Sequence, residues 1–388
     1  MTTITDRQRR ARLAHRHGLT RRSPSDPPAV VSLTEALVGW HATDPATPFL
    51  SARARLDGFS VADLETALYD SGDAVKHLGM RRTLFVQAGA VLPVVQAACT
   101  RDIVAKARRQ LAADVVKGGV TTDGDGWLRD VGGETLAALA ELGSATGAQL
   151  SRAVAPLQVK LTYGEGRSWG GEVGVATRVL SILAAEGHIR RGRPAAWTSS
   201  QHRWVPVAEP IEWLPADEAR AGLVRHYLSA FGPATTDDIC WWTGLGRRQV
   251  AAALSTIAAL EVDAEGVPAW ILPDDLDPVP EPDPWVALLP SLDPTTMGWK
   301  ERHWYLGDHG PRLFDRSGNA GPTIWLDGRI VGGWAQRAGG EVACELFEDV
   351  GAEAMAAVEA EADALTAWMG GAVVRPRFPT PTDKALRA

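Results

Sequence analysis

Three polar side chains with the potential for water chemistry lie together near the start of the chain: His41, Thr43 and Asp44, just ahead of Pro45. A residue before a proline is biased towards an extended backbone, and in an extended segment residues i and i+2 point to the same side. This spacing predicts that His41 and Thr43 face one water molecule. A neutral imidazole can accept the proton of that water while the threonine hydroxyl holds it, and Asp44 can orient the histidine or supply negative charge.

Each of these residues also has a structural interpretation. A histidine near a helix end can be satisfied by the helix dipole, and an aspartate before a proline is a common turn former. The sequence contains no GxSxG, HExxH or Walker motif. Neither the three widely spaced cysteines nor His226, His303 and His309 have metal-ligand spacing, so no metal site is predicted.

Length and composition indicate an ordinary globular protein of two to four domains. The 388 residues are 45% hydrophobic, which is too apolar for a disordered chain. The arginine-rich start lacks the apolar region of a secretory signal, and no apolar run reaches the roughly 18 residues of a membrane span. A cytoplasmic protein is therefore predicted. The net charge of -7 argues against a uniformly basic surface but permits local basic patches that contact DNA.

Short helices followed by a β-rich run occur three times before residue 275. The first set has predicted helices at 6–17, 32–40, 48–56 and 60–69 and a strand at 82–86. The second has two helices within 132–158, a helix at 173–186 that stops at Gly187, and strands at 189–194 and 196–198. The third has helices at 217–230, 235–241 and 247–260 and strands near 262 and at 269–272. Helix, glycine stop, strand, basic turn and strand follow one another as in a winged helix, whose wing would touch the DNA backbone.

A linker rich in aspartate and proline, 273–284, separates these sets from a β-rich region. Asp327-Gly328 is typical of a type I′ hairpin turn. Strands are predicted at 285–289, 312–314, 323–326, 329–334, 342–346 and 373–374, with a closing helix at 352–369. Many short strands in succession predict a small barrel or sandwich.

Several short segments carry a family resemblance. They are 39–45 (GWHATDP), 80–85 (MRRTLF), 191–193 (RGR), 289–294 (LPSLDP), 297–302 (MGWKER) and 328–334 (GRIVGGW). Through them the chain resembles the AlkZ/YcaQ-like winged-helix DNA glycosylases, from about Arg9 to Val374. The resemblance implies an α+β fold of tandem winged-helix domains in a C-shaped arrangement plus a small C-terminal β-barrel.

The same resemblance implies the domain organisation and the activity. The implied domains are a first winged-helix domain with a basic N-terminal helix at 1–125, a second at 126–212, a third at 213–275, and a β-barrel domain with a closing helix at 276–388. The implied activity is hydrolysis of the N-glycosidic bond of alkylated (cationic N7/N3) purines in double-stranded DNA, including bulky or crosslinked adducts. No cofactor is implied, and a C-shaped monomer that encircles the duplex needs no partner.

The chain departs from the family at the catalytic element. The family has a Gln-x-Gln or Gln-x-Asp triplet before the Asp-Pro pair, and this chain has His41-Ala42-Thr43. Because a cationic purine leaves readily, the enzyme needs a placed water rather than a lysine Schiff base. His41, Thr43 and Asp44 are therefore the expected catalytic residues of a monofunctional glycosylase. The lost glutamine and the acidic total charge favour an alternative, a non-catalytic winged-helix DNA-binding protein or transcription regulator.

Two groups of residues are expected to contact DNA. The turn at 297–304 resembles a family hairpin that reaches the lesion or the minor groove. Lys300 and Arg302 are predicted to pair with phosphates, and Trp299 to stack or wedge against a base. In the alternative interpretation, Trp299 and Trp304 belong to the core of the barrel. The phosphate contacts predicted for the second wing are Arg191, Arg193 and Arg203.

Overall fold

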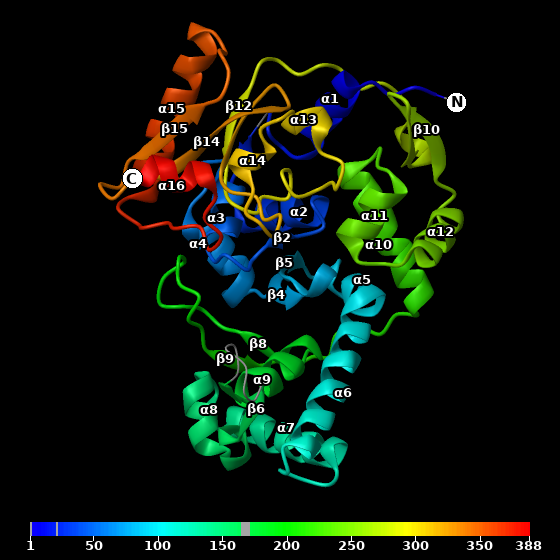
Figure 1. Ribbon diagram of the computed structural model, residues 1–388, viewed down its shortest axis with the longest axis vertical. Helices are drawn as coiled ribbons and strands as arrows, with labels where there is room; N and C mark the ends of the chain where they lie inside the picture. Colours follow the sequence, from blue (N-terminus) through cyan, green and yellow to red (C-terminus); the bar gives the residue numbers. More distant parts are fainter. Residues whose placement is uncertain (1, 21, 164–170) are drawn as a thin grey trace.

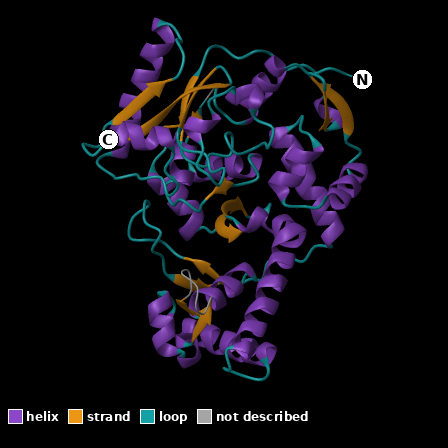
Figure 2. Ribbon diagram, in the orientation of Figure 1, coloured by secondary structure: helices purple, strands orange, loops and turns teal. Residues whose placement is uncertain are grey.

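The computed structural model describes residues 2–20, 22–163 and 171–388 (Figure 1). Helices occur throughout this part of the chain, with short sheets between them (Figure 2). A body that contains both ends of the chain lies above a smaller lobe, which begins with α6 (Arg101–Lys117). None of the helices in the described ranges is both long and apolar enough to cross a membrane.

Four helices and a small sheet form the N-terminal part. The helices are α1 (Asp6–Arg16), α2 (Pro27–Ala36), α3 (Thr47–Arg53) and α4 (Val61–Glu65). The antiparallel sheet has the order β2 (Trp40–His41), β5 (Leu84–Ala88), β4 (Ala74–Leu78), and a short parallel pair joins β1 (Ser23–Pro24) to β3 (Leu56–Asp57). The helices predicted at 6–17, 48–56 and 60–69 and the strand predicted at 82–86 are confirmed with shifted ends.

The helix predicted at 32–40 begins and ends earlier than expected. Asp26 caps it by accepting a hydrogen bond from the backbone N–H of Ala29 at 2.7 Å, and Pro27 occupies the first turn, where its missing N–H costs nothing. Trp40 therefore lies in β2 rather than on a helix.

Strand β2 can approach β5 only because Gly39 precedes it. Gly39 has a φ of 148°, and a Cβ atom there would lie 2.8 Å from the carbonyl oxygen of Val86. Along β2 the side chains alternate. Trp40 packs among the helices of the N-terminal part, whereas His41 lies on the other face of the sheet against Phe85.

The lobe contains the second set of elements and has its own hydrophobic core. After α5 (Leu92–Val95), its helices are α6, α7 (Gly124–Leu142), α8 (Gly147–Ala153) and α9 (Ala176–Ala185). Its hairpins pair β6 (Lys160–Tyr163) with β7 (Gly171–Gly174) and β8 (Ile189–Arg191) with β9 (Trp204–Pro206). The strand predicted at 196–198 is wrong, because Arg191 pairs with Trp204, and Trp197 packs instead against Phe49 and Trp368.

The third set follows the predicted order closely. Its elements are α10 (Ala216–Phe231), α11 (Thr236–Thr243), α12 (Arg247–Thr256), β10 (Leu260–Ala264) and β11 (Val267–Ile271). A capping box between Thr235 and Asp238 starts α11, and Gly244 ends it in a left-handed conformation. Three helices followed by a hairpin is the order expected for a winged helix, and the winged-helix domains stay a prediction.

The C-terminal strands form an open antiparallel sheet, so the predicted barrel is corrected. The order is β12 (Val286–Leu289), β13 (Thr323–Leu326), β14 (Arg329–Gln336) and β15 (Val342–Leu346). Four strands are too few to close around a packed interior. The sheet packs instead against α15 (Ala352–Met369), which buries Val358 and Leu365.

Smaller features of this region agree in part with prediction. The Asp327-Gly328 turn has positive φ at both residues, as a type I′ hairpin requires. Residues 312–314 are not a strand, because they belong largely to α14 (Gly310–Leu313), which follows α13 (His303–Leu306). The strand predicted at 373–374 is irregular, and α16 (Pro381–Arg387) follows it.

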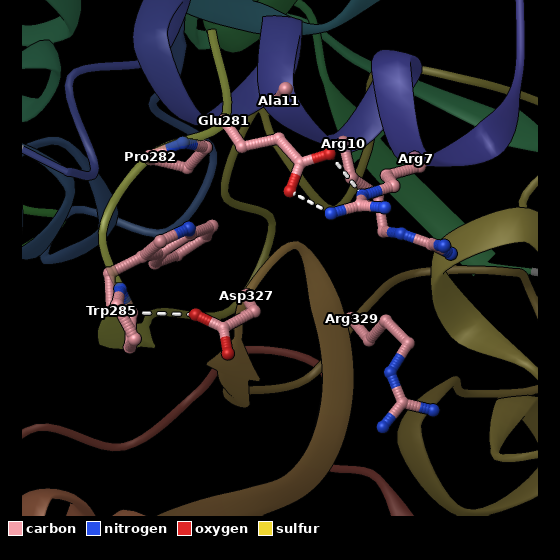
Figure 3. A pocket seen from close by; sticks show the side chains of 9 residues that line it. Arg7, Arg10, Ala11, Glu281, Pro282, Trp285, Asp327 and Arg329 are labelled. Atoms are coloured by element: carbon pink, nitrogen blue, oxygen red, sulfur yellow. Dashed lines mark hydrogen bonds and ion pairs between the residues drawn. The ribbon is translucent and has the colours of Figure 1, made fainter.

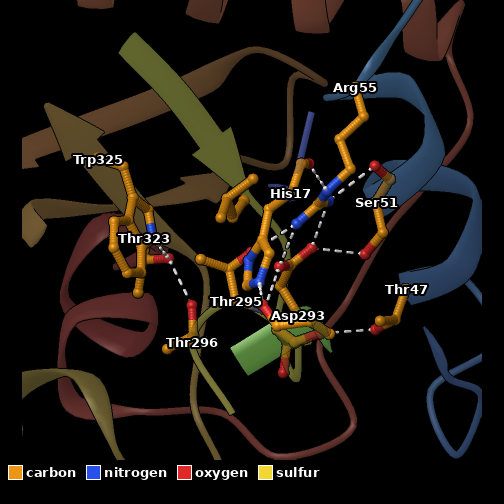
Figure 4. Close-up of polar contacts among 12 residues, drawn as sticks. His17, Thr47, Ser51, Arg55, Asp293, Thr295, Thr296, Thr323 and Trp325 are labelled. Atoms are coloured by element: carbon orange, nitrogen blue, oxygen red, sulfur yellow. Dashed lines mark hydrogen bonds and ion pairs between the residues drawn. The ribbon is translucent and has the colours of Figure 1, made fainter. Parts of the chain in front are cut away.

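A buried ion pair joins the N-terminal part to the C-terminal region (Figure 4). Arg55 donates to both carboxylate oxygens of Asp293, at 2.7 and 2.9 Å, and both side chains are fully buried. Ser51 also donates to Asp293, at 2.6 Å, and Arg55 donates to the hydroxyl of Thr295 and the carbonyl of His17. Burial by itself raises the pKa of Asp293, but the Arg55 charge and these hydrogen bonds outweigh burial and hold the pKa below its ordinary value.

Breaking this pair is expected to unfold the protein much more readily. Arg55→Met leaves the Asp293 carboxylate buried without its counter-charge, which costs about 3–5 kcal/mol. Urea denaturation followed by circular dichroism measures the loss. The matched control is Arg312→Met in the more exposed pair with Glu345, which should cost about 0–1 kcal/mol. Equal losses for the two variants would contradict a special role for the buried pair.

Candidate active site

A cavity of about 420 Å³ lies beside the bend that follows β2, and we call it the Thr43 cavity. Its walls come from parts of the chain that are far apart in sequence: the bend itself, β4, the β8–β9 hairpin and the C-terminal segment after α15. The polar side chains that line it include Thr43, Tyr69, Lys76, Arg191, His202 and Arg377.

His41 does not share this cavity with Thr43, which corrects the predicted geometry. The residue is 4% exposed, its ring centroid lies 4.5 Å from that of Phe85, and neither ring nitrogen has a hydrogen-bond partner among the described residues. Burial, with the nearby charge of Arg81, lowers its pKa to about 3, so the imidazole is neutral at physiological pH. The chain bends directly after β2, so positions 41 and 43 do not face one water as an extended segment would require.

Asp44 makes the turn contacts that are common for an aspartate before a proline. Its two carboxylate oxygens accept backbone hydrogen bonds from Ala46 at 3.0 Å and Arg377 at 2.9 Å. Burial raises its pKa, and these two hydrogen bonds oppose the rise. The carboxylate thus holds the turn ahead of α3 and ties the C-terminal segment to the bend, and it makes no hydrogen bond with the His41 ring.

Three cationic side chains line the Thr43 cavity. Lys76 lies with its ammonium 5.8 Å from the ring centroid of Tyr69, and Arg191 lies 5.0 Å from the ring of Trp204. Arg377 donates to the carbonyl oxygen of Thr43 at 3.3 Å. Within the part of the chain that the structure describes, none of the three forms an ion pair with a carboxylate. Unneutralised cations around one hollow favour an anion such as a phosphate.

The other arginines predicted in the second wing are engaged with protein partners. Arg193 pairs with Asp70 at 2.7 Å and with Glu65 at 3.6 Å. Arg203 donates to the hydroxyl and the carbonyl of Ser144 at 2.7 and 2.6 Å. Arg191 alone of the three predicted arginines lines the cavity.

The prediction that Trp299 stacks on a base is wrong for this structure. Trp299 is 3% exposed, and its indole N–H donates to the carbonyl of Phe231 at 2.9 Å, so the alternative core role is the one adopted. Lys300 is half-exposed and pairs with Asp237 and Glu301. Arg302 donates to the Trp299 carbonyl at 2.6 Å. None of these residues lines the Thr43 cavity.

Comparison with known proteins places the chain in a family. The family model described as "DNA glycosylase AlkZ-like" matches residues 34–368. This chain belongs to the AlkZ-like DNA glycosylase family. The solved structure of Streptomyces sahachiroi DNA glycosylase AlkZ aligns with a TM-score of 0.71 over 96% of this chain and 98% of that chain, at 20% identity, and therefore shares the fold.

A curated relative is similar over a shorter stretch. The "Interstrand DNA cross-link repair glycosylase" of Streptomyces sahachiroi is 27% identical over 140 residues, which are 34% of this chain and 36% of that protein. The alignment thus spans about a third of the relative. In this AlkZ-like chain, His41 ends β2, and Ala42 and Thr43 form part of the wall of the Thr43 cavity.

Sequence reasoning missed Lys76, His202 and Arg377. None belongs to a recognised motif, and their proximity depends on contacts between distant segments. The available signal for Lys76 was its place inside the β-rich run at 74–78. Lysine is depleted in strands, so a lysine there is a candidate for a functional role.

A second hollow, of about 360 Å³, shows a different charge balance (Figure 3). Arg7 pairs there with Glu281, Arg329 pairs with Glu348, and Arg10 donates to a backbone carbonyl. Two of its three arginines are therefore paired with carboxylates, whereas the described residues offer no carboxylate partner to the three cations of the Thr43 cavity.

Three buried histidines should make this AlkZ-like protein sensitive to acid. Burial lowers the pKa of His17 and His41 to about 3 and that of His77 to about 4. In the unfolded chain the pKa is near 6.5, so between about pH 6.5 and 4 the unfolded state binds more protons and stability falls as pH falls. Each histidine contributes about 1 kcal/mol per pH unit there.

Denaturant unfolding of the wild type and of His41→Gln at pH 7, 6 and 5 tests this dependence. In the variant, the slope of the free energy of unfolding against pH should be smaller by roughly the contribution of one histidine. His303→Gln, at an exposed position, should keep the slope of the wild type. An unchanged slope in His41→Gln would show that this imidazole is protonated in the folded state.

Proposed function

We propose that this protein is a DNA glycosylase that hydrolyses the N-glycosidic bond of alkylated, cationic N7 or N3 purines in double-stranded DNA, bulky adducts and crosslinks included. The observation that carries the proposal is the Thr43 cavity, which joins the family's catalytic segment to three cations without carboxylate partners among the described residues. Such a hollow suits the sugar-phosphate backbone of a damaged nucleotide.

The chemistry of base release asks little of the side chains. A cationic purine leaves readily, so the site must hold a water near C1′ and bind the strand in register. Thr43 lines the cavity and can hold that water through its hydroxyl. His41 supports the site from behind the sheet as a neutral, buried ring. Water is the nucleophile of this step, and no cofactor is required.

Arg191 and Arg377 are proposed to bind the phosphates that flank the lesion. Both line the cavity, and Arg191 lies in the second wing, where a backbone contact is expected. Lys300 and Arg302 are proposed as further contacts outside the cavity, with Lys300 weakened by its pairs with Asp237 and Glu301. We further propose that the protein acts as a monomer on nucleoid DNA in the cytoplasm.

Base release from defined lesions tests the proposed activity. We expect the wild type to release N7-methylguanine or a bulkier N7 adduct from a duplex. Thr43→Ala should be slower by about tenfold, the equivalent of one lost hydrogen bond, and Thr43→Ser should recover most of the rate. No release by the wild type from either lesion, with DNA still bound, would select the non-catalytic DNA-binding alternative.

Salt-dependent DNA binding tests the phosphate contact. Arg191→Gln should weaken duplex binding and reduce the slope of log K against log salt by about one, as expected for one lost phosphate contact. Arg193→Gln is the matched control, because that arginine is already paired with Asp70 and Glu65. A larger change in the slope for Arg193→Gln than for Arg191→Gln would reverse the assignment.

A further inference from the structure

Lys76 is a primary amine in an unusual place. It lies in β4, an edge strand of the three-stranded N-terminal sheet, and it lines the Thr43 cavity. Its ammonium nitrogen is 5.8 Å from the ring centroid of Tyr69 and 5.9 Å from that of Phe49. Aromatic faces replace much of the water that would surround an exposed lysine.

Burial and a neighbouring positive charge together favour the neutral form of Lys76. Arg191, on the wing, opposes a second positive charge, and Glu65 in α4 is an acidic group that favours the charged form. Tyr69, His202 and Arg377 also face the cavity. Burial first, and then Arg191, lower the pKa of Lys76 to about 8.

Other lysines of the chain have ordinary surroundings. Lys160 is 63% exposed and pairs with Glu172, and Lys300 pairs with Asp237. No carboxylate lies within ion-pair distance of Lys76 in the described ranges of the chain. A desolvated amine next to another cation is the arrangement that activates a lysine as a nucleophile towards carbonyl carbon.

We propose that Lys76 captures the abasic sugar as a covalent imine and then cleaves the DNA strand beside it. This inference rests on the proposed function, because base release leaves a deoxyribose whose open form carries an aldehyde at C1′. It adds a lyase step to the monofunctional activity expected from the sequence. The substrate is an abasic site in DNA.

The step balances without any added reagent. The Lys76 amine attacks C1′, a carbon–nitrogen bond forms, and the aldehyde oxygen leaves as water to give the imine. The C2′ proton then passes to water, its electron pair forms the C2′=C3′ double bond, and the C3′–O bond breaks with departure of the 3′ phosphate. Arg191 and Arg377 line the same cavity and can stabilise that phosphate. Hydrolysis of the imine restores the amine.

Borohydride trapping on a duplex with one preformed abasic site tests the inference. Borohydride reduces the imine to a stable amine, so the wild type should form a covalent protein–DNA adduct whose mass maps to the peptide with Lys76. Lys76→Arg keeps the positive charge and should reduce the adduct at least tenfold. Lys160→Arg, the matched control on the surface, should form it as the wild type does. The yield should rise between pH 6.5 and 8.5, as the amine loses its proton.

The outcomes separate this inference from the proposed function. Base release from the alkylated duplex and binding of the same duplex are measured separately for the same variants. Trapping without base release would support the role of Lys76 as the imine-forming amine and refute the proposed glycosylase activity. Base release without trapping, or trapping that persists in Lys76→Arg on another amine, would overturn the role of Lys76.

Discussion

The fold depends on the buried pair between Arg55 and Asp293. Removing two charges from water is costly, and the pair is stable only because each charge has several hydrogen-bonding partners in a fixed geometry. Arg55 follows α3 and Asp293 follows β12, so the pair joins segments separated by more than 230 positions. Nearby, the hydroxyl of Thr47 donates to the Ser291 carbonyl at 2.7 Å, which fixes α3 against the same segment.

The Thr43 cavity is a consequence of that junction. Once α3 is fixed, the bend at 42–46 is held on one side, and the C-terminal segment attaches to it through Arg377 and Asp44. The cations of the cavity form no ion pair with a carboxylate among the described residues. Arg193, by contrast, pairs with Asp70, and Arg7 in the second hollow pairs with Glu281. Repulsion among unneutralised cations makes the site ready for an anion, because binding one relieves it.

Local patterns predicted much of the secondary structure, and long-range contacts decided the rest. The glycine stop at Gly187 and the turn at Asp327-Gly328 are short-range signals, and the structure has both features. The strand predicted at 196–198 was misplaced because the partner of β8 is the segment that contains Trp204, and local propensity does not specify that pairing. The open C-terminal sheet, the burial of Trp299 and the presence of Lys76 and Thr43 in one cavity wall depend on packing between distant segments, which no periodicity encodes. Conversely, a two-residue spacing was insufficient to place His41 and Thr43 together, because the backbone bends between them and the proline.

The anchors of the bend are largely main-chain atoms. The N–H of Ala42 donates to the Leu84 carbonyl at 2.8 Å, and the carbonyl of Thr43 accepts from Arg377. Neither bond uses a side chain of the triplet, so mutation can exchange those side chains without releasing the backbone from its place. Positions 41 and 43 can therefore vary in side-chain chemistry while the backbone frame stays unchanged. The His-x-Thr triplet of this chain is one product that such freedom permits.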